Sequence, residues 1–265
     1  MRIIFVRHGE PDYSTDTLTP QGQREAAALA ARVREKNWKV DKCYVSTMGR
    51  AKETAAPTLE VLGQTAVEYD WLREFDPRIL DPSTHEEHCA WDLMPQDYTA
   101  DPVMMDPKEW MHAKFYAQYP EIEQKAKMVF KGIDDLVAEY GYIRHGDYFD
   151  FVDPSGHVNP AECEDIMLHG TSNYVVRDED DEKTIVIFCH LGVTGLILSH
   201  LLGISPVAIW HGICIPPTGL TVVNTEKRLH NQAHFRIQAL GDTAHLYAAG
   251  VPLSGYAAFS PVFNG

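Results

Sequence analysis

Short apolar runs that alternate with helix-like segments constrain the fold of this chain more than any other feature. The run at residues 184–189 is the most strand-like, and a helical pattern follows it. Near the N-terminus, Thr19 predicts a helix N-cap, Pro20 predicts the first helical position, and Pro57 predicts a kink or break in a later helix. We expect strands at residues 2–6, 40–46, 66–69, 184–189, 220–224 and 234–240, and helices at residues 20–36, 49–62, 107–119, 121–140 and 194–202. This alternation predicts an α/β fold, a three-layer α/β/α sandwich with a mostly parallel sheet and a large, mainly helical insertion.

The middle of the chain differs in character from its two ends. It is rich in tryptophan and tyrosine, and residues 142–152 are typical of a short hairpin. We therefore assign residues 1–77 and 184–265 to the α/β core. Residues 78–183 are expected to be an insertion that forms a cap or lid over the site.

The distribution of charge limits the partners of this protein. The formal net charge is −15, and the field of such a chain repels nucleic acid and anionic membranes. Residues 1–53 are an exception, because they carry ten basic and seven acidic side chains. An anionic ligand is therefore expected near the N-terminal segment.

The composition indicates a folded protein with reduced thiols. Hydrophobic residues make up 45% of the chain, and no apolar run reaches the ~18 residues that a membrane helix needs. The first apolar run is interrupted by Arg7 and His8, and it is too short for a signal peptide. The cysteines are widely spaced and include no C-x-x-C pair, so we expect free thiols in the cytoplasm.

Two histidines follow two of the predicted strands. His8 comes directly after the first strand and His190 directly after the strand at 184–189, so both are expected at the carboxyl edge of the sheet. Arg7 precedes His8, and Arg50 begins a helix whose N-terminus favours an anion. Arginine binds phosphate through paired hydrogen bonds, and a neutral imidazole can attack phosphorus. These residues predict a phosphate site.

The departing oxygen of a phosphate ester needs a proton, so a carboxylic acid is expected beside the phosphate. Glu74 follows the third predicted strand and is the best candidate. Three neighbouring acids remain as alternatives: Glu68, Asp70 and Asp76.

Other chemical patterns are absent or have a plainer explanation. The chain contains no G-x-S-x-G, G-x-G-x-x-G or Walker A sequence, so hydrolase-elbow, dinucleotide and P-loop sites have no support. The stretch at residues 85–88 has its histidines at i and i+3, and we interpret it as a polar helix turn rather than a metal site. Cys189 is interpreted as a packed strand residue, and His157 and His169 are either substrate contacts or surface residues.

Five motifs follow one another in a fixed order along the chain. They are Arg7-His8-Gly9-Glu10, Leu18-Thr19-Pro20-Gln21-Gly22, the run from Ser46 to Ala55, Leu72-Arg73-Glu74 and Cys189-His190. In this order and spacing the chain resembles the histidine phosphatase superfamily, the phosphoglycerate mutase-like family. The resemblance covers residues 1–77 and 184–247, and it includes a C-terminal segment, Asp242-Thr243-Ala244-His245-Leu246.

The resemblance implies a role for each matching residue. His8 would become a phosphohistidine, while Arg7, Arg50 and His190 would hold the phosphoryl oxygens. Glu74 would protonate the leaving oxygen and then activate water. The resemblance implies no metal and no cofactor, because the cations take over the electrostatic role. Candidate substrate contacts are Gly9, Ser14 (where the family often has Asn), Leu191 (where it usually has Gly), Arg78 and His145.

We expect a metal-independent phosphomonoesterase that acts on a small phosphorylated molecule, releases inorganic phosphate and forms a homodimer. A cofactor-dependent phosphoglycerate mutase is the alternative. A mutase needs a second cluster of cations, whereas Arg78 is the only basic residue at positions 75–82. A non-catalytic phospho-ligand-binding protein on the same fold is a third hypothesis.

Overall fold

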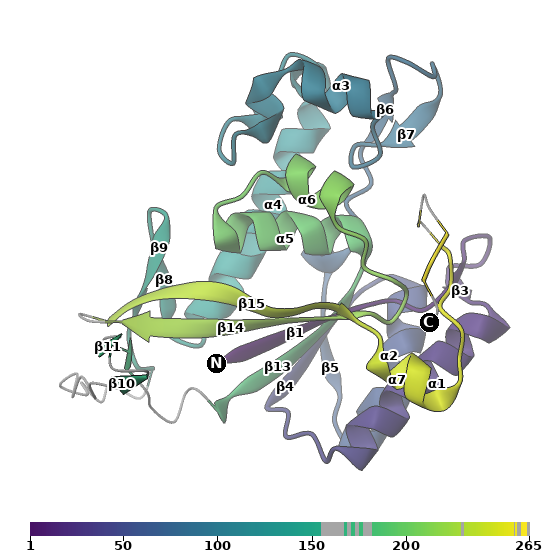
Figure 1. The fold of residues 1–265 in the computed structure, drawn as a ribbon, viewed down its shortest axis with the longest axis vertical. Coiled ribbons are helices and arrows are strands. Elements are labelled where there is room, and N and C mark those ends of the chain that lie inside the picture. The colour runs from purple at the N-terminus through teal and green to yellow at the C-terminus, as the bar shows by residue number, and fades with distance from the viewer. Residues whose placement is uncertain are drawn as a thin grey trace.

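A mixed β-sheet runs through the centre of the molecule (Figure 1). The computed structural model describes residues 1–154, 167–168, 171–172, 175–176, 182–228, 231–256, 258 and 261–263. The main sheet has the strand order β5-β4-β13-β1-β14-β15-β9-β8. Its strands are β1 (Arg2–Arg7), β4 (Lys42–Ser46), β5 (Ala66–Tyr69), β8 (Tyr142–His145), β9 (Tyr148–Phe151), β13 (Thr184–Cys189), β14 (Leu220–Arg228) and β15 (Gln232–Asp242), and the short β12 (Val175–Val176) pairs with β14.

The predicted parallel arrangement holds for β5, β4, β13 and β1. Beyond β1 the strands pair antiparallel, from β14 through β15 and β9 to β8. Because β1, β4 and β13 run in the same direction, their carboxyl ends meet at one edge of the sheet. This edge carries the candidate site.

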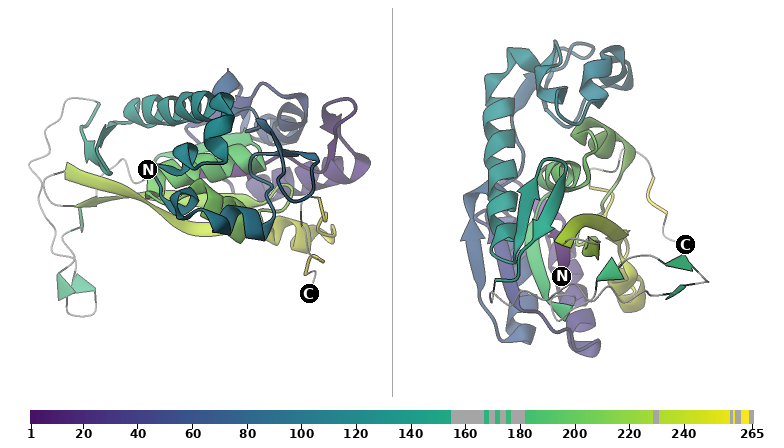
Figure 2. Two further views of the ribbon diagram at one scale, coloured as in Figure 1. Left: turned by 90° about the horizontal axis from the view of Figure 1, so that it is seen from above. Right: turned by 90° about the vertical axis from the view of Figure 1, so that its left-hand side faces the viewer.

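Alternate residues of β1 enter two separate cores. Ile3 and Phe5 pack into the core that also contains residues of α4 (Pro120–Ala138) and α5 (Leu191–Leu202). Ile4 and Val6 pack with α1 (Pro20–Glu35) and α2 (Gly49–Leu62) on the opposite face. Each fully buried side chain of this size contributes roughly 1.5–3 kcal/mol. The two cores confirm the predicted three-layer α/β/α fold, which Figure 2 shows from two further directions.

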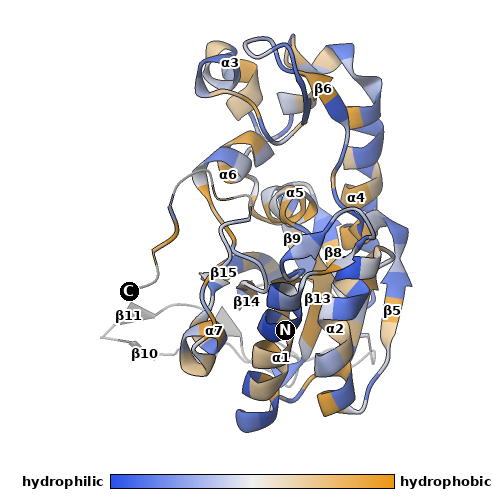
Figure 3. Ribbon diagram, turned by 90° about the vertical axis from the view of Figure 1, so that its right-hand side faces the viewer, coloured by the Kyte–Doolittle hydropathy of each residue, from blue (hydrophilic) through white to orange (hydrophobic). Residues whose placement is uncertain are grey.

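Local sequence features explain the start of α1, and they were expected to interrupt α2. The Thr19 hydroxyl accepts a hydrogen bond from the Gly22 N–H at 3.1 Å, which confirms the predicted N-cap. The predicted break at Pro57 does not occur, since α2 continues through it. Figure 3 shows polar and apolar residues alternating around α1 and α2, as helices with one buried face require.

The segment 78–183 contributes to two parts of the molecule. Part of it forms the predicted hairpin β8–β9, which extends the main sheet. Another part stands beyond α5 and α6 at the top of Figure 1. This upper part comprises the hairpin of β6 (Arg78–Leu80) and β7 (Glu87–Cys89) and the helix α3 (Pro95–Ala100), and it faces α6 (Pro206–Gly212).

The predicted helix at 107–119 is wrong, whereas the helix predicted at 121–140 is confirmed as α4. Two short 3-10 turns, Trp110–His112 and Tyr116–Gln118, replace the former. The buried residues of the stretch 107–119 are Trp110, Ala113 and Tyr116. Their spacing of three matches the 3-10 period rather than the α period.

The remaining elements are short. They are β2 (Pro11–Asp12), β3 (Thr17–Leu18), β10 (Met167–Leu168), β11 (Thr171–Ser172), α7 (Ala244–Ala249) and two further 3-10 turns, Asp70–Leu72 and Pro102–Met105. Of these, α7 contacts α1. The interpretation of residues 85–88 as a polar helix turn is also wrong, because β7 begins at Glu87 and His88 lies in it. No helix in the described parts of the chain combines the length and apolar character needed to span a membrane.

Candidate active site

The two predicted histidines lie side by side at the ends of neighbouring strands. Strands β1 and β13 pair in parallel with Arg7 opposite Cys189, so the next residue of each strand is His8 and His190. Their ring centroids are 5.1 Å apart, and both side chains are buried. The fold therefore brings together two residues that are 182 positions apart in the sequence.

The His8 ring is held in one tautomer. Its Nδ1 lies 2.7 Å from the Gly9 carbonyl oxygen, which can only accept a hydrogen bond, so Nδ1 carries the proton. Burial holds the pKa of His8 well below its ordinary value, and the charges of Arg7 and Arg50 lower it further. The ring is therefore neutral near pH 7, and the lone pair resides on Nε2.

The backbone around His8 is fixed by neighbouring elements. The His8 N–H donates to the Cys189 carbonyl at 2.9 Å, and the Gly9 N–H donates to the Thr54 hydroxyl at 2.9 Å. A Cβ at Gly9 would lie 2.8 Å from the Gly22 carbonyl oxygen, so only glycine permits this close approach to α1. The Gly9 N–H is thus engaged within the protein and holds the loop against α2.

His190 caps the start of α5 and faces the end of β4. Its Nε2 lies 2.8 Å from the Ser46 hydroxyl, while its buried Nδ1 has no hydrogen-bond partner among the described residues. Burial holds the pKa of His190 well below its ordinary value, with His8 and Arg50 contributing in the same direction. Leu191 is the first residue of α5, beside His190.

Two buried arginines belong to the same cluster. Arg7 donates to the Ile215 carbonyl at 2.6 Å and to the Tyr256 carbonyl at 3.3 Å, and burial lowers its pKa. Arg50 pairs with Asp16 at 2.5 Å. The Nε atoms of both arginines are buried and find no acceptor within the described residues. Unpaired buried donors on two cations are a free-energy cost that an anion would remove.

Sequence reasoning missed Asp16, which organises the start of α2. Its Oδ2 accepts the Gly49 N–H at 2.7 Å and its Oδ1 pairs with Arg50. The residue has a positive φ of 54°, a conformation that Asp tolerates better than most residues. No sequence signal distinguishes it, because it caps a helix that begins 33 residues later.

Glu74 is the acid that the structure brings to this cluster. Its Oε1 accepts the Phe75 N–H at 2.9 Å and the Val193 N–H at 3.0 Å, and the latter ties it to the first turn of α5. Burial raises its pKa, and the two backbone hydrogen bonds and Arg50 oppose that rise. Each of the three alternative acids is exposed and bonded elsewhere: Glu68 to Lys52, Asp70 to Thr47, and Asp76 to Lys125.

Several other predicted contacts lie apart from this cluster or outside the described residues. Ser14 is exposed and bonds to Asp12, and Arg78 donates to the Glu87 carbonyl and the Cys89 sulfur. His145 is exposed on the outermost strand of the sheet, where it bonds to Asp150. Cys189 is buried against Thr194, and burial raises its pKa to about 12. His157 and His169 fall outside the described residues.

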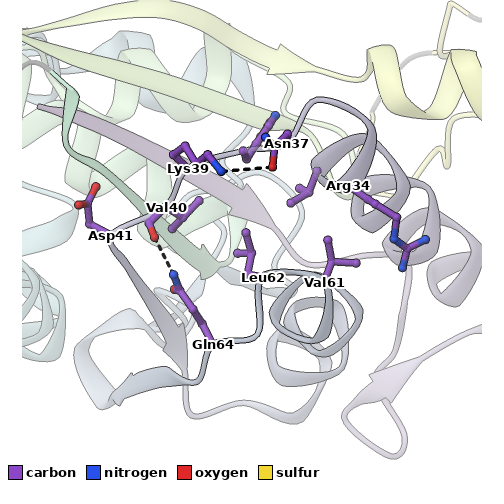
Figure 4. Close-up of a pocket in the computed structure, with 10 residues that line it drawn as sticks. Arg34, Asn37, Lys39, Val40, Asp41, Val61, Leu62 and Gln64 are labelled. Carbon is purple, nitrogen blue, oxygen red and sulfur yellow. Dashed lines mark hydrogen bonds between the residues drawn. The ribbon is translucent and has the colours of Figure 1, made fainter.

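A separate cavity of about 390 Å³ lies at the opposite end of the parallel strands (Figure 4). The Gln64 side chain donates to the Val40 carbonyl there at 2.6 Å. No residue of the histidine cluster lines it. Among the residues that the structure describes, no group of three or more His, Cys, Asp or Glu side chains is arranged to hold a metal ion.

Comparison with known proteins gives a family match and two kinds of relatives. The family model of the histidine phosphatase superfamily, branch 1, matches residues 3–137. A 2,3-bisphosphoglycerate-dependent phosphoglycerate mutase from Bartonella tribocorum is 31% identical over 75 residues, or 25% of this chain, and one from Brucella ovis is 32% identical over the same length. The match spans about a third of those mutases, 36% of their length.

Solved structures resemble almost the whole chain. A mutant phosphoserine phosphatase from Entamoeba histolytica, in complex with phosphoserine, has a TM-score of 0.53 at 19% identity, covering 92% of this chain and 98% of that one. A mycobacterial glucosyl-3-phosphoglycerate phosphatase, in complex with inorganic phosphate, gives the same four values. At such low identity, the likeness shows a shared fold.

Proposed function

The chain belongs to the histidine phosphatase superfamily. We propose that it is a phosphomonoesterase that transfers the phosphoryl group of a small molecule to His8 and then to water. The observation that carries the proposal is the hydrogen bond from His8 Nδ1 to the Gly9 carbonyl, together with the lowered pKa of His8. A neutral imidazole with Nε2 free of a proton is the nucleophile that this chemistry needs.

The first step uses the groups that surround His8. Nε2 attacks phosphorus and forms the N–P bond, while the bond from phosphorus to the ester oxygen breaks. The raised pKa of Glu74 keeps its carboxyl protonated to a higher pH than an exposed glutamate, so it can give its proton to the departing oxygen. Arg7, Arg50 and His190 stabilise the charge on the phosphoryl oxygens.

The second step regenerates the enzyme. Glu74, now a carboxylate, takes a proton from a water molecule that attacks phosphorus. The N–P bond breaks, inorganic phosphate leaves, and His8 returns to its neutral form. We propose that no metal ion takes part, because the buried arginines supply the positive charge.

The upper part of segment 78–183 is proposed as the cap that selects the substrate. A Cβ built at Gly192 would lie 2.5 Å from the Trp91 ring and 2.7 Å from Glu74 Oε1, so Trp91 adjoins the proton donor. The leaving group, which takes its proton from Glu74, would therefore meet this wall. The thiols within the described residues are free, and we place the enzyme in the reducing cytoplasm.

Hydrolysis of p-nitrophenyl phosphate in excess EDTA tests the proposal, with wild type compared with His8→Ala. We expect hydrolysis that EDTA does not diminish, and a loss of at least ~10³-fold in kcat for the variant. His145→Ala is the matched control, because His145 is exposed and bonds to Asp150 far along the sheet. Acid-labile phosphate bound to wild type but not to His8→Ala identifies the intermediate. Equal activity of His8→Ala and wild type would exclude His8 as the nucleophile.

A phosphoglycerate mutase is the second candidate, favoured by the 75-residue match to mutases. Against it, the guanidinium of Arg78 donates to Glu87 and Cys89 within its own hairpin. Incubation with 3-phosphoglycerate and a bisphosphate primer distinguishes the two. Release of inorganic phosphate supports the phosphatase, and formation of 2-phosphoglycerate supports the mutase.

A further inference from the structure

A turn between α6 and β14 holds the strand end that carries the nucleophile. The Gly219 N–H donates to the Pro216 carbonyl at 2.8 Å and closes a four-residue turn. Its third residue, Thr218, is fully buried, and its N–H donates to the carbonyls of Arg7, at 3.0 Å, and His8, at 3.3 Å. The opposite side of the same strand end is held by the Cys189 carbonyl, which accepts the His8 N–H.

Thr218 adopts a backbone conformation that its side chain disfavours. Its φ is +55°, and the third position of a turn with positive φ is normally filled by glycine or asparagine. A β-branched residue there is strained and persists only when its surroundings fix it. We therefore expect the hydrogen bonds of the Thr218 hydroxyl to offset this backbone strain.

The Thr218 hydroxyl is fixed from two sides. It donates its one proton to the Pro217 carbonyl at 2.8 Å, so it must accept a hydrogen bond from His245 Nε2 at 3.0 Å. His245 is thereby held as the Nε2–H tautomer. Its Nδ1 has no partner among the described residues, and its side chain is 2% exposed.

His245 itself stands on a rigid support. It lies in the first turn of α7, where the Asp242 carboxylate accepts the Ala244 N–H at 2.8 Å. The same carboxylate pairs with Arg32 of α1 at 2.7 Å. Hydrogen bonds, joined through the backbone of α7 between Ala244 and His245, thus connect α1 with the turn and with the backbone of the nucleophile.

We infer that Thr218 and His245 are positioning residues, which hold the Arg7–His8 backbone so that the His8 ring meets the phosphorus atom in line. The inference rests on the proposed function, in which His8 is the nucleophile. Loss of the hydroxyl would let Thr218 relax towards negative φ and would release the two carbonyls. A displacement of the nucleophile by about 1 Å lowers the chemical rate by roughly 10²-fold. Phosphate affinity should change less than kcat, because two of the three proposed phosphate ligands, Arg50 and His190, lie on α2 and at the start of α5 and not on the strand end that Thr218 holds.

The test compares isosteric pairs of variants with p-nitrophenyl phosphate as substrate and inorganic phosphate as inhibitor. Thr218→Val and His245→Phe remove the two ends of one hydrogen bond, whereas Thr218→Ser and His245→Gln retain a hydroxyl and an N–H donor. Thr221→Val is the matched control, because that buried hydroxyl in β14 has no partner among the described residues. Thermal unfolding confirms that each variant is folded.

We expect Thr218→Val and His245→Phe to lower kcat by at least ~10-fold, with the inhibition constant of phosphate within ~3-fold of wild type. Thr218→Ser and His245→Gln should recover most of the rate, and Thr221→Val should match wild type. A kcat for Thr218→Val equal to that of Thr221→Val overturns the inference, as does a failure of serine to rescue. If Thr218→Val does not fold, the His245 pair decides in the same way.

The phosphoenzyme of wild type separates the two proposals. Wild type that forms a phosphohistidine while the variants keep full activity contradicts the positioning role alone. Wild type that hydrolyses the ester without phosphorylating His8 contradicts the proposed function, and the positioning role with it.

Discussion

His8 and His190 meet with their ring centroids 5.1 Å apart, and burial together with the neighbouring arginines lowers the pKa of both. Two imidazoles at this distance cannot both be charged without a large repulsion. At neutral pH the positive charge of the site therefore comes from Arg7 and Arg50. In the proposed mechanism, the neutral His8 ring attacks phosphorus, His190 donates a hydrogen bond, and the two guanidinium groups attract the substrate.

Arg50→Gln should weaken phosphate binding far more than Lys52→Gln, which removes an equal charge from the same helix. Arg50 is 5% exposed and its buried Nε has no acceptor in the described residues, whereas Lys52 on the same helix is half-buried and pairs with Glu68. We expect the dissociation constant of inorganic phosphate to rise at least ~10-fold for Arg50→Gln and less than ~2-fold for Lys52→Gln. Isothermal titration with phosphate measures both, and equal effects would mean that only net charge matters.

The loss of kcat in Glu74→Gln should depend on the leaving group of the substrate. A carboxamide cannot protonate the departing oxygen, so kcat for glycerol phosphate should fall ~10²–10⁴-fold. The p-nitrophenolate ion leaves without a proton, and the loss with p-nitrophenyl phosphate should be smaller.

The pH dependence of Glu74 gives a second check. Because burial raises the pKa of Glu74, wild-type kcat/KM for glycerol phosphate should decline as pH rises through that pKa, and the decline should vanish in the variant. Glu68→Gln is the control, since Glu68 is exposed and pairs with Lys52. The same loss with both substrates would argue against proton donation.

Gly192→Ala should inactivate the enzyme by contact rather than by charge. The new methyl group would lie 2.5 Å from the Trp91 ring and 2.7 Å from Glu74 Oε1, so the cap wall or the acid must move. Gly212→Ala in α6 meets nothing within 4 Å and serves as the control. We expect at least a ~10-fold lower kcat/KM for Gly192→Ala alone. Unchanged kinetics would show that Trp91 moves aside freely.

The stability of the protein should depend on pH through His245. Burial, and then Arg32, lower the pKa of His245 to about 4, against about 6.5 when unfolded. Between these values the unfolded state binds more protons, so the contribution of His245 to the free energy of unfolding is lost as the pH falls. This contribution decreases by about 2 kcal/mol between pH 7 and pH 5.

His245→Gln isolates that contribution, because glutamine does not titrate. The free energy of unfolding in urea, wild type minus variant, should therefore fall by about 2 kcal/mol from pH 7 to pH 5. The subtraction removes the opposite effect of Glu25, whose pKa burial raises to about 6. A difference that is constant with pH would contradict the buried, neutral state of His245.

The sequence is informative where a residue's position follows from the strand or helix that carries it. The predicted strands place His8 and His190 at the same carboxyl edge of the sheet, and the direct pairing of β1 with β13, which the sequence does not predict, makes them neighbours. Arg50 was placed by the start of α2, which agrees with the prediction at both ends. The order of layers followed from the alternation of strands and helices.

Residues that act through loops could not be predicted in the same way. Asp16 and Thr218 both adopt positive φ, which no residue type outside glycine signals reliably. Their partners, Gly49 and His245, lie 33 and 27 positions away in the sequence. The helix predicted at 107–119 failed because a spacing of three and a spacing of 3.6 differ little over so short a stretch.

The parallel pairing of β1 with β13 also determines when this protein can first work. A ribosome completes β1 early, but the partner strand and His190 follow only after the whole segment 78–183 has been synthesised. Closing so long a loop is slow and entropically costly, and the exposed edge of β1 must wait unpaired in the meantime. The proposed phosphatase activity should therefore appear only after β1 has paired with β13, so its recovery during refolding would report completion of the central sheet.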